Sequence, residues 1–357
     1  MTGHRALAIL DDRRPELETC AYCPKLCRAA CPVADAEASD TVTPWGQMSS
    51  VHSVARGARA PSAEYAELPW ACAGCFACRE RCDHRNAVVE TLYDARAEYA
   101  ARGLAPEAAQ RVRASFGKRR ERLKRRVAEL QRQHGYDGAA PIALLVGCDY
   151  ARHLPRESDD AVRAARALLG PVRLIAECCG LPLTLAGDPE GARAARDRVL
   201  AEAAGARQIV AVDAGCAYAL RASGAVPFAR AALDALGASS RPPPFGAERL
   251  RYHDPCLLGR GLGEYDAPRA LVARAAEGGV QEFSYRRERA RCSGGGGLLP
   301  ATRPNTAAAI ARVRVDEHAR LGGGTIVTAC AQSLRRFREA GASALDLATV
   351  VRRLAEP

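Results

Sequence analysis

Short apolar runs separated by stretches rich in Ala and Arg dominate the chain from about residue 139 onward. Runs such as IALLVG and QIVAVD are short and rich in β-branched residues, which is typical of buried strands, while the stretches between them have helical composition. Strands that alternate with helices predict parallel βαβ units. The predicted strands form two sets of three on either side of the Pro-rich segment 239–246: 142–147, 172–176 and 208–213, then 249–253, 280–284 and 325–329.

The segment from Val88 to Gly135 has a different pattern. It is rich in Ala, Glu, Arg and Leu, with Pro106 as the one interruption, and its apolar residues fall on one helical face. These features predict helices with Leu123, Val127 and Leu130 turned toward a core. Between residues 31 and 72, a 40-residue insert predicts a loop and a short helix. It contains Trp45 and Trp70, which either exclude water from a nearby site or fill a small core.

Composition bounds the possibilities. A chain of 357 residues is long enough for two or three domains. Its N-terminus has no extended apolar leader, so fifteen cysteines indicate a reducing, cytoplasmic compartment rather than a secreted disulfide scaffold. No apolar run is long enough to span a bilayer, so we expect any membrane contact to be peripheral.

The formal net charge of +11 is concentrated in one place. Residues 111–132 hold ten Lys or Arg and two Glu, which gives 10 − 2 = +8. Such a helix can be a solvated face, or it can dock on an acidic partner or lipid surface. The run has few aromatic residues interleaved for base stacking, which argues against nucleic acid as the partner.

Two cysteine runs near the N-terminus carry the clearest chemistry. CAYCPKLCRAACP supplies Cys20, Cys23, Cys27 and Cys31, and CAGCFACRERC supplies Cys72, Cys75, Cys78 and Cys82. The spacing of the second run matches the bacterial ferredoxin pattern, in which three close thiolates bind one [4Fe-4S] cube and the fourth binds the other. The first run differs by one extra residue before Cys27, and the second ends in Asp83 where proline is usual.

This spacing predicts two [4Fe-4S] clusters with crossed ligands. The first would be held by Cys20, Cys23, Cys27 and Cys82, and the second by Cys72, Cys75, Cys78 and Cys31. The alternative is a pair of structural zinc sites, because two Cys-x2-Cys pairs suffice for a closed tetrahedral site. Four cysteines within eleven or twelve residues, twice, favour the cubes.

The later cysteines recur as a degenerate repeat. Cys148, Cys178 and Cys216 return as Cys256, Cys292 and Cys330, each closely following a predicted strand. Ligands gather at the carboxyl ends of strands in open α/β sheets, so we expect two halves that face each other around a shared cleft. The glycine runs 294–297 and 322–324 lack a P-loop pattern and indicate instead that the backbone approaches a cluster or the facing half.

These motifs together resemble a known family. The ferredoxin pair, then ECCG (177–180), YHDPCLLGRG (252–261) and RCSGGGG (291–297), is similar to the cysteine-rich, CCG-domain iron–sulfur proteins. That family includes heterodisulfide reductase subunits, the glycolate oxidase iron–sulfur subunit and one subunit of anaerobic glycerol-3-phosphate dehydrogenase. The resemblance implies transfer of electrons from a flavoprotein dehydrogenase to a quinone or a disulfide.

The chain departs from the full family motif in both halves. Ala219, Ser293 and Ser333 stand where the pattern has further cysteines. The first half keeps four thiols that could hold one additional iron–sulfur cluster: Cys148, Cys178, Cys179 and Cys216. The second half keeps only three, and His253 is a candidate fourth ligand beside Cys256, Cys292 and Cys330, because imidazole can ligate iron.

The expected fold is α+β overall, with a mainly helical ferredoxin-like module followed by a pseudo-twofold tandem α/β module. The expected domains are 1–95, a basic helical linker at 96–138, and cysteine-rich halves at 139–240 and 247–357. The resemblance and the two predicted clusters imply an electron-transfer subunit of an oxidoreductase. Since the sequence shows no flavin or nicotinamide fold of its own, we expect its electrons to come from a partner. The alternatives are a metal-binding module that docks on nucleic acid or an acidic partner, and an autonomous reductase that uses the repeat cleft.

Overall fold

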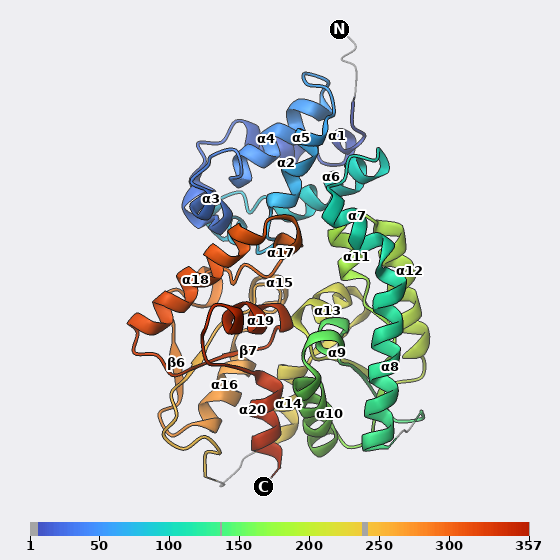
Figure 1. Ribbon diagram of the computed structural model, residues 1–357, viewed down its shortest axis with the longest axis vertical. Coiled ribbons are helices and arrows are strands. Elements are labelled where there is room, and N and C mark those ends of the chain that lie inside the picture. Colours follow the sequence, from blue (N-terminus) through green and yellow to red (C-terminus); the bar gives the residue numbers. More distant parts are fainter. Residues whose placement is uncertain (1–5, 136–137, 238–241, 357) are drawn as a thin grey trace. The chain divides into compact units, whose positions relative to one another are not determined.

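The computed structural model describes residues 6–135, 138–237 and 242–356 (Figure 1). It is a mixed α/β chain with two small parallel sheets. The chain divides into two compact units. Unit 1 comprises residues 1–115, 182–192 and 291–313, and unit 2 comprises residues 116–181, 193–290 and 314–357. The two units interleave along the chain.

Unit 1 is built from short helices. They are Ile9–Asp12 (α1), Arg14–Ala21 (α2), Pro32–Glu37 (α3), Pro44–Ala55 (α4), Ala63–Glu67 (α5), Val88–Ala101 (α6), Glu107–Ala114 (α7) and Leu299–Thr302 (α17), with 3₁₀ helices at Leu26–Ala30 (η1), Pro69–Ala71 (η2) and Arg79–Arg81 (η3). Their core includes fully buried Trp70, Tyr99 and Leu92. The indole Nε1 of Trp70 donates a hydrogen bond to the Leu185 carbonyl at 3.1 Å, so this tryptophan fixes residues 182–192 within the unit.

The long insert between the cysteine runs contains more helix than expected. The predicted loop and short helix are present, but α4 extends over twelve residues and α5 follows it. Thr43 begins α4 by accepting a hydrogen bond from Gly46 N at 3.0 Å, and Pro44 occupies the first helical position, where its missing N–H costs nothing.

Unit 2 contains both parallel sheets, and their strand orders correspond. One sheet has the order β2-β1-β3-β4 and the other β6-β5-β7-β8. The strands are Ile142–Leu145 (β1), Val172–Leu174 (β2), Gln208–Ala211 (β3), Val226–Pro227 (β4), Leu250–Tyr252 (β5), Val280–Glu282 (β6), Thr325–Thr328 (β7) and Ala344–Asp346 (β8). All six predicted strands are confirmed. The edge strands β4 and β8 were not predicted, because each is followed directly by a helix, α14 or α20, with no turn residues between them.

The helices of unit 2 connect these strands. They are Phe116–His134 (α8), Cys148–His153 (α9), Pro155–Leu169 (α10), Ala214–Ala219 (α13), Phe228–Leu236 (α14), Gly259–Leu262 (α15), Asp266–Ala275 (α16), Ala331–Glu339 (α19) and Leu347–Ala355 (α20), with 3₁₀ helices at Arg221–Ser223 (η4) and Arg287–Arg289 (η5). Leu181–Leu185 (α11), Pro189–Glu202 (α12) and Pro304–Arg320 (α18) have residues in both units.

Helices from the two sheets pack against each other in exchanged pairs. Helix α10, which follows β1, packs on α20, which follows β8, and α14, which follows β4, packs on α16, which follows β5 (Figure 1). Since α10 corresponds to α16 and α14 to α20 in sheet order, the two contacts are equivalent under exchange of the halves. This helical layer joins the two sheets of unit 2.

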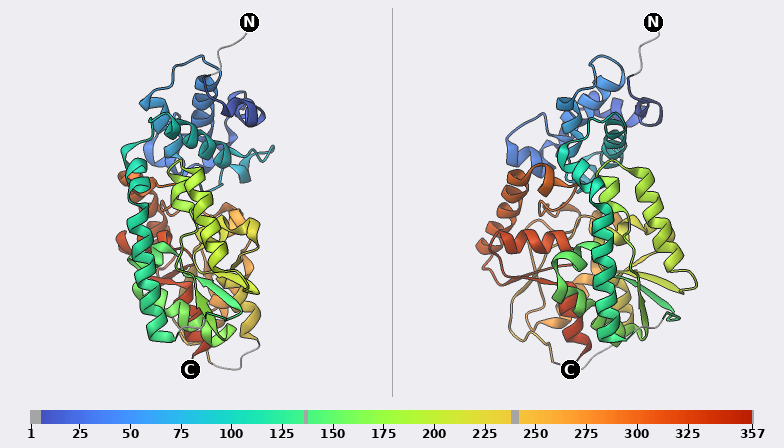
Figure 2. Two further views of the ribbon diagram at one scale, coloured as in Figure 1. Left: turned by 90° about the vertical axis from the view of Figure 1, so that its right-hand side faces the viewer. Right: turned by 45° about the vertical axis from the view of Figure 1, so that its right-hand side comes forward.

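The basic helix α8 lies along the first half of unit 2, packed on α9 and α10 (Figure 2). Leu123, Val127 and Leu130 are buried, which confirms the predicted inner face. Within the described ranges, no helix has both the length and the apolar composition needed to cross a membrane.

The limits of the two compact units differ from those of the four expected domains. Residues 182–192 and 291–313, which the sequence places in the two cysteine-rich halves, group with the N-terminal module instead. Cys292 therefore belongs to unit 1, whereas Cys256 and Cys330 belong to unit 2.

Candidate metal centre

Cys20, Cys23, Cys27 and Cys82 lie together in unit 1 and are called here the first thiol group. Cys20 is in the last turn of α2, Cys27 is in η1, and Cys82 directly follows η3, which packs on η1. Burial raises the pKa of the Cys20 thiol to about 12 against the opposing hydrogen bond from Asn86, and the charges of Cys27, Cys82 and Cys23 raise it further. The last cysteine of the second run is thus a neighbour of the first run.

The first thiol group is the more open of the two groups in unit 1. Cys23, Cys27 and Cys82 are half-buried, and only Cys20 is buried. Two large apolar side chains beside them face solvent, Tyr22 at 80% exposure and Leu26 at 58%. The amide of Asn86 donates a hydrogen bond from Nδ2 to Cys20 Sγ at 3.1 Å, which supplies a neutral donor to a sulfur.

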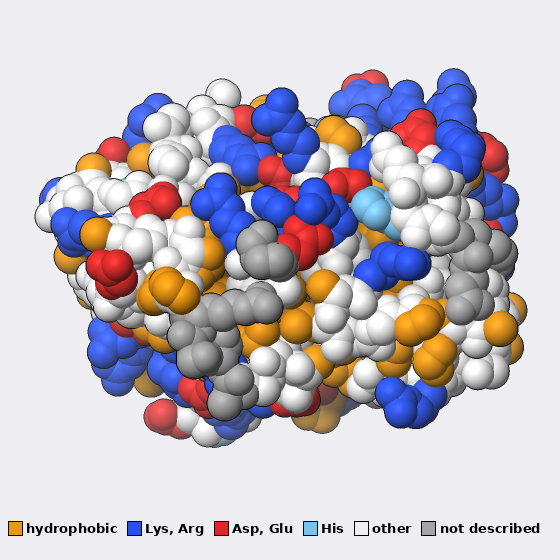
Figure 3. Space-filling model, turned by 90° about the horizontal axis from the view of Figure 1, so that it is seen from below, with side chains coloured by type: hydrophobic (Ala, Val, Ile, Leu, Met, Phe, Trp, Pro, Cys, Tyr) orange, Lys and Arg blue, Asp and Glu red, His pale blue; other side chains and the backbone are white. Residues whose placement is uncertain are grey.

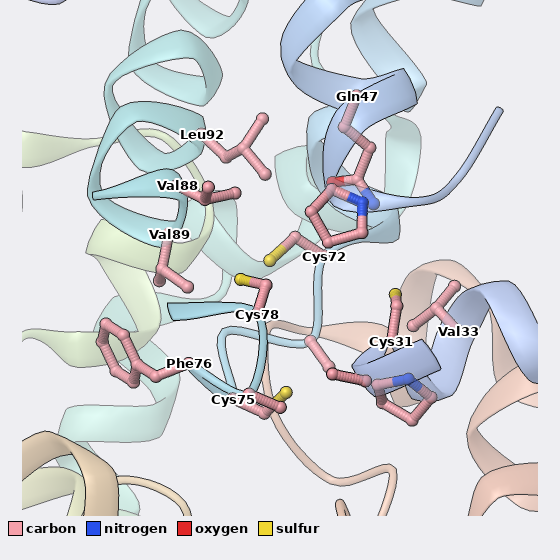
Figure 4. Close-up of a pocket in the computed structure, with 15 residues that line it drawn as sticks. Cys31, Val33, Gln47, Cys72, Cys75, Phe76, Cys78, Val88, Val89 and Leu92 are labelled. Carbon is pink, nitrogen blue, oxygen red and sulfur yellow. The ribbon is translucent and has the colours of Figure 1, made fainter. Parts of the chain in front are cut away.

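Cys31, Cys72, Cys75 and Cys78 form the second thiol group, which lines a small pocket (Figure 4). Phe76, Val88 and Leu92 complete its apolar wall. Cys31 begins α3, and its pKa is raised to about 12 by burial against a hydrogen bond from the Ala34 backbone, with the charges of Cys75 and Cys72 adding to the rise.

The backbone also donates a hydrogen bond to a sulfur of the second thiol group. Gly74, at φ +63°, donates a hydrogen bond from its N–H to Cys72 Sγ at 3.3 Å. Burial raises the pKa of Cys72 to about 11, while the Arg96 guanidinium and this N–H oppose the rise. Burial also raises the pKa of Cys78. The charges of the other cysteines of its own group and of Cys27, from the first thiol group, raise it further. The two groups are therefore neighbours.

The cysteines of the first α/β half also come together. Cys148, Cys178, Cys179 and Cys216 are all buried, and they form the third thiol group. They lie beyond the carboxyl ends of β1, β2 and β3, where open α/β sheets collect ligands. Cys178 Sγ is 3.6 Å from Cys148 Sγ. The contact with Cys178 lowers the pKa of Cys179, but the contact with Cys216 and burial outweigh it and raise this pKa well above its ordinary value.

One arginine of the basic helix points into the third thiol group. Arg119 Nη1 lies 3.5 Å from Cys148 Sγ and 3.1 Å from a carboxylate oxygen of Asp149. Arg120 likewise makes a bidentate pair with Glu177, with both distances 2.5 Å. Part of the charge that the sequence assigns to a solvated or docking face is therefore neutralised inside unit 2. On the face drawn in Figure 3, basic and acidic side chains also lie next to each other.

In the described part of unit 2, the second half brings together two cysteines, Cys256 and Cys330. Cys330 caps the start of α19, and the charge of Cys256 reaches it. Ser333, which stands at a family cysteine position, donates a hydrogen bond to the Cys330 sulfur and lowers its pKa against the dominant effect of burial. Cys292 lies in unit 1, where its Sγ accepts a hydrogen bond from Gly294 N at 3.3 Å.

His253 is held in a packed environment. Its ring meets Phe337 edge-on with centroids 4.8 Å apart, and its Nδ1 lies 3.4 Å from Arg314 Nε. Burial, together with the charges of Arg314 and Arg260, keeps the pKa of His253 well below its ordinary value. The ring is therefore neutral, as a metal ligand must be, and its role as an iron ligand stays a prediction.

Sequence reasoning missed Asn86, Arg96 and Arg119, the polar side chains that contact the cysteine segments. None of the three lies inside a cysteine run. The sequence around Arg96 and Arg119 has the composition of an ordinary helix. Only Asn86 has a local signal, since it follows Cys82 by four residues. A helical arginine that faces inward cannot be told from a solvated one before the packing is known.

The first and second thiol groups suit an iron–sulfur cofactor in their chemistry. Each offers four soft thiol ligands, an apolar or half-buried setting and an N–H donor to a sulfur, which are the features that hold and tune such clusters. Among the described residues, no three Cys, His, Asp or Glu side chains are placed around a single metal-ion position.

Comparison with protein families agrees with this chemistry. Residues 16–86 match the 4Fe-4S dicluster domain, and residues 142–221 and 250–334 each match the cysteine-rich domain called CCG. The chain belongs to the cysteine-rich-domain iron–sulfur proteins. Both cysteine runs of the first two thiol groups fall within the dicluster match, and the third thiol group falls within the first cysteine-rich match.

Curated relatives of this cysteine-rich-domain protein are similar over about a third of its length. A probable membrane-anchored ferredoxin of Chromohalobacter salexigens is 36% identical over 113 residues, which is 32% of this chain and 17% of that protein. One subunit of the dihydromethanophenazine:CoB–CoM heterodisulfide reductase is 32% identical over 107 residues in Methanosarcina barkeri and 33% over 102 residues in Methanosarcina mazei.

The matched segments span only part of these relatives. They cover 30% and 29% of this chain and 26% and 25% of the two heterodisulfide reductase subunits, respectively. No solved structure matches the chain.

Proposed function

We propose that this chain is the iron–sulfur electron-transfer subunit of an oxidoreductase complex. It would receive electrons from a flavoprotein dehydrogenase or another redox subunit and pass them to a quinone, a disulfide or another acceptor. The likeness to a heterodisulfide reductase subunit supports this class of function. Bound [4Fe-4S] clusters would supply one-electron redox sites.

The observation that carries the proposal is the exchange of cysteines between the two runs. Cys31, from the first run, lines the pocket of Cys72, Cys75 and Cys78, while Cys82 senses Cys20 and its neighbours. A pair of independent zinc sites needs no such exchange, whereas adjacent cubes of the ferredoxin type do. We therefore assign one cluster to each of the first two thiol groups.

The protein's own residues give the two sites different surroundings. Phe76 and Val88 keep water from the second thiol group, whereas Cys23, Cys27 and Cys82 remain half-exposed. Electron transfer between proteins needs close approach of the redox sites, so the first thiol group is the better point of exchange with a partner. Exposed Tyr22 and Leu26 lie at this point.

The cysteine-rich halves form the second part of the proposal. We infer a pseudo-twofold tandem pair, supported by the matching sheet orders and by the exchanged helix contacts. The compact third thiol group supports one additional iron–sulfur cluster in the first half. We keep Cys256, Cys292, Cys330 and His253 as a weaker candidate site. The domain limits 1–95, 96–138, 139–240 and 247–357 and a cytoplasmic location belong to the same proposal.

Iron and acid-labile sulfide analysis of anaerobically prepared protein tests the proposal. We expect about eight iron atoms per chain from two cubes, or about twelve with a third cluster. Electron paramagnetic resonance should show cubane signals on reduction, and a reduced flavoprotein should reduce the chain. Zinc without labile sulfide would overturn the proposal. Turnover of a disulfide or quinone by the isolated chain would instead favour the autonomous reductase.

A further inference from the structure

Arg96 of α6 is a fully buried arginine whose hydrogen-bond partners are all backbone carbonyls. Its side chain has 0% exposure. Nε and Nη2 donate to the Pro69 carbonyl at 3.1 and 2.9 Å, and Nη2 also donates to the Cys72 carbonyl at 2.8 Å. Nη1 donates to the carbonyls of Leu185 and Gly297, both at 3.1 Å. All five N–H donors of the guanidinium are thus used.

These bonds satisfy the hydrogen-bonding capacity of Arg96 but leave its charge uncompensated. Carbonyls carry no net charge, and in the described part of the chain no Asp or Glu is within reach of this guanidinium; the ionisable groups that face it are Tyr93 and Cys72. The rings of Tyr93 and Trp70 lie 4.9 and 5.6 Å from it. A buried charge without a counter-charge is costly, so one is expected nearby.

Arg314 shows the ordinary solution to the same problem. It is also fully buried, and its guanidinium lies over the Phe283 ring. Unlike Arg96, it forms an ion pair, with Glu317 at 2.7 Å. Of these two fully buried arginines, Arg314 therefore has a carboxylate beside it, whereas Arg96 lies beside the ligand segment at Cys72.

We propose that the counter-charge of Arg96 is the anionic cofactor held by Cys31, Cys72, Cys75 and Cys78, and that Arg96 is a positioning residue that raises the reduction potential of this cofactor. This inference rests on the proposed function. A cube with four thiolates carries a charge of roughly −2, and one electron taken from an external reductant increases it by one negative unit. A fixed positive charge in a medium of low polarity stabilises the reduced state more than the oxidised one. In the first thiol group, the side chain that donates to Cys20 Sγ is the neutral amide of Asn86.

The position of Arg96 also joins three segments around this cofactor. The same guanidinium binds residues 69–72, Leu185 and Gly297, which come from all three stretches of chain that make up unit 1. A residue that only held these segments together would need the five hydrogen bonds but not the charge. The two roles can therefore be separated by experiment.

The test compares Arg96→Gln, which removes the charge, with Arg96→Lys, which keeps the charge and loses most of the hydrogen bonds. Potentials of the holoprotein are measured by anaerobic titration with electron paramagnetic resonance. The signal that Cys20→Ser abolishes identifies the first thiol group.

We expect the other signal, from the second thiol group, to have the higher potential in the unmodified protein. Arg96→Gln should lower its reduced-to-oxidised ratio at least tenfold at fixed potential, which is about 59 mV, while Arg96→Lys should change it less than threefold.

Arg102→Gln is the matched control, since it removes an exposed arginine that follows the same helix. It should leave both potentials unchanged. Loss of iron from the second thiol group in Arg96→Gln but not in Arg96→Lys also supports the counter-charge. Equal loss of iron in both variants, or an unchanged potential in Arg96→Gln, would overturn it and leave a purely structural role. Absence of iron and labile sulfide from the unmodified protein would instead contradict the proposed function.

Discussion

The hydroxyl of Tyr150 donates a hydrogen bond to Oδ2 of Asp346 at 2.5 Å and so joins the two α/β halves of unit 2. Tyr150 belongs to α9, and Asp346 ends β8 and caps α20 by accepting from Ala348 N at 2.8 Å. Burial raises the pKa of Asp346 to about 7 against the opposing effects of these two hydrogen bonds. The junction between the halves therefore contains a carboxyl group that holds its proton near neutral pH.

This carboxyl should make stability depend on pH. Its folded pKa lies above the unfolded value, so the stabilisation is complete below about pH 4 and is lost as pH rises toward 7. We expect the free energy of unfolding of unit 2 to fall with pH in that window by up to about 1.4 kcal/mol per pH unit from this group. Asp346→Asn, which keeps the size of the side chain and one of its two acceptor oxygens and cannot ionise, should remove that slope between pH 5.5 and 7.

Anaerobic urea unfolding at a series of pH values measures the effect. Asp266→Asn is the control, because Asp266 is an exposed carboxylate whose pKa is lowered by its hydrogen bond with Arg287, so its loss should not flatten the profile in this window. A slope that is identical in Asp346→Asn and in the unmodified protein would contradict the assignment.

Crossed ligation by the two cysteine runs predicts a specific result for paired substitutions. Cys20→Ser with Cys82→Ser removes two ligands of one predicted cluster, so about four iron atoms per chain should be lost. Cys20→Ser with Cys31→Ser removes a ligand from each, and both clusters should be lost. Iron analysis of the two double variants distinguishes the patterns, because ligation run by run would give the opposite result.

The third thiol group should hold iron independently of the first two. Cys179→Ser removes a buried thiol from this group, and we expect the iron content to fall from about twelve to about eight atoms per chain while both N-terminal signals persist. Cys256→Ser is the comparison in the second half, where an unchanged iron content would show that the weaker candidate site holds no cluster. An unmodified protein with only eight iron atoms would show that the third group is unoccupied.

Gly297 should be required for the second thiol group, because the Cβ of any other residue would lie 2.1 Å from the Cys72 carbonyl oxygen. Gly297→Ala should cost roughly 2 kcal/mol or more, since backbone strain at positive φ adds to this clash. Gly323→Ala is a matched control, because Gly323 has φ +64°, close to the +65° of Gly297, but open space around its Cα. It should cost about 1 kcal/mol. Thermal unfolding and iron retention measure both; equal costs would contradict the close approach.

Several features of the site could be predicted from the sequence because they depend on local spacing. The interval between cysteines limits which thiols share a cluster, and the ferredoxin spacing predicted that Cys31 and Cys82 exchange partners. Six strands followed from short apolar runs, whereas β4 and β8 run directly into a helix and leave no separate pattern. The glycine run at 294–297 was expected to approach a cluster or the facing half, and Gly297 approaches the backbone of the ligand segment at Cys72.

The sequence by itself determined the types of chemistry and their order along the chain. These are two cysteine runs suited to [4Fe-4S] cubes, a basic helix, and two α/β halves that have fewer cysteines than the family motif. Only the tertiary structure decided which charges meet those cysteines. Arg96 and Arg119 read as ordinary helical arginines, yet one lies buried beside the Cys72 carbonyl and the other faces Cys148. The grouping of Cys292 with unit 1 was likewise decided by the fold. Periodicity records which face of a helix is apolar, but the partner of a buried charge depends on contacts between residues far apart in sequence.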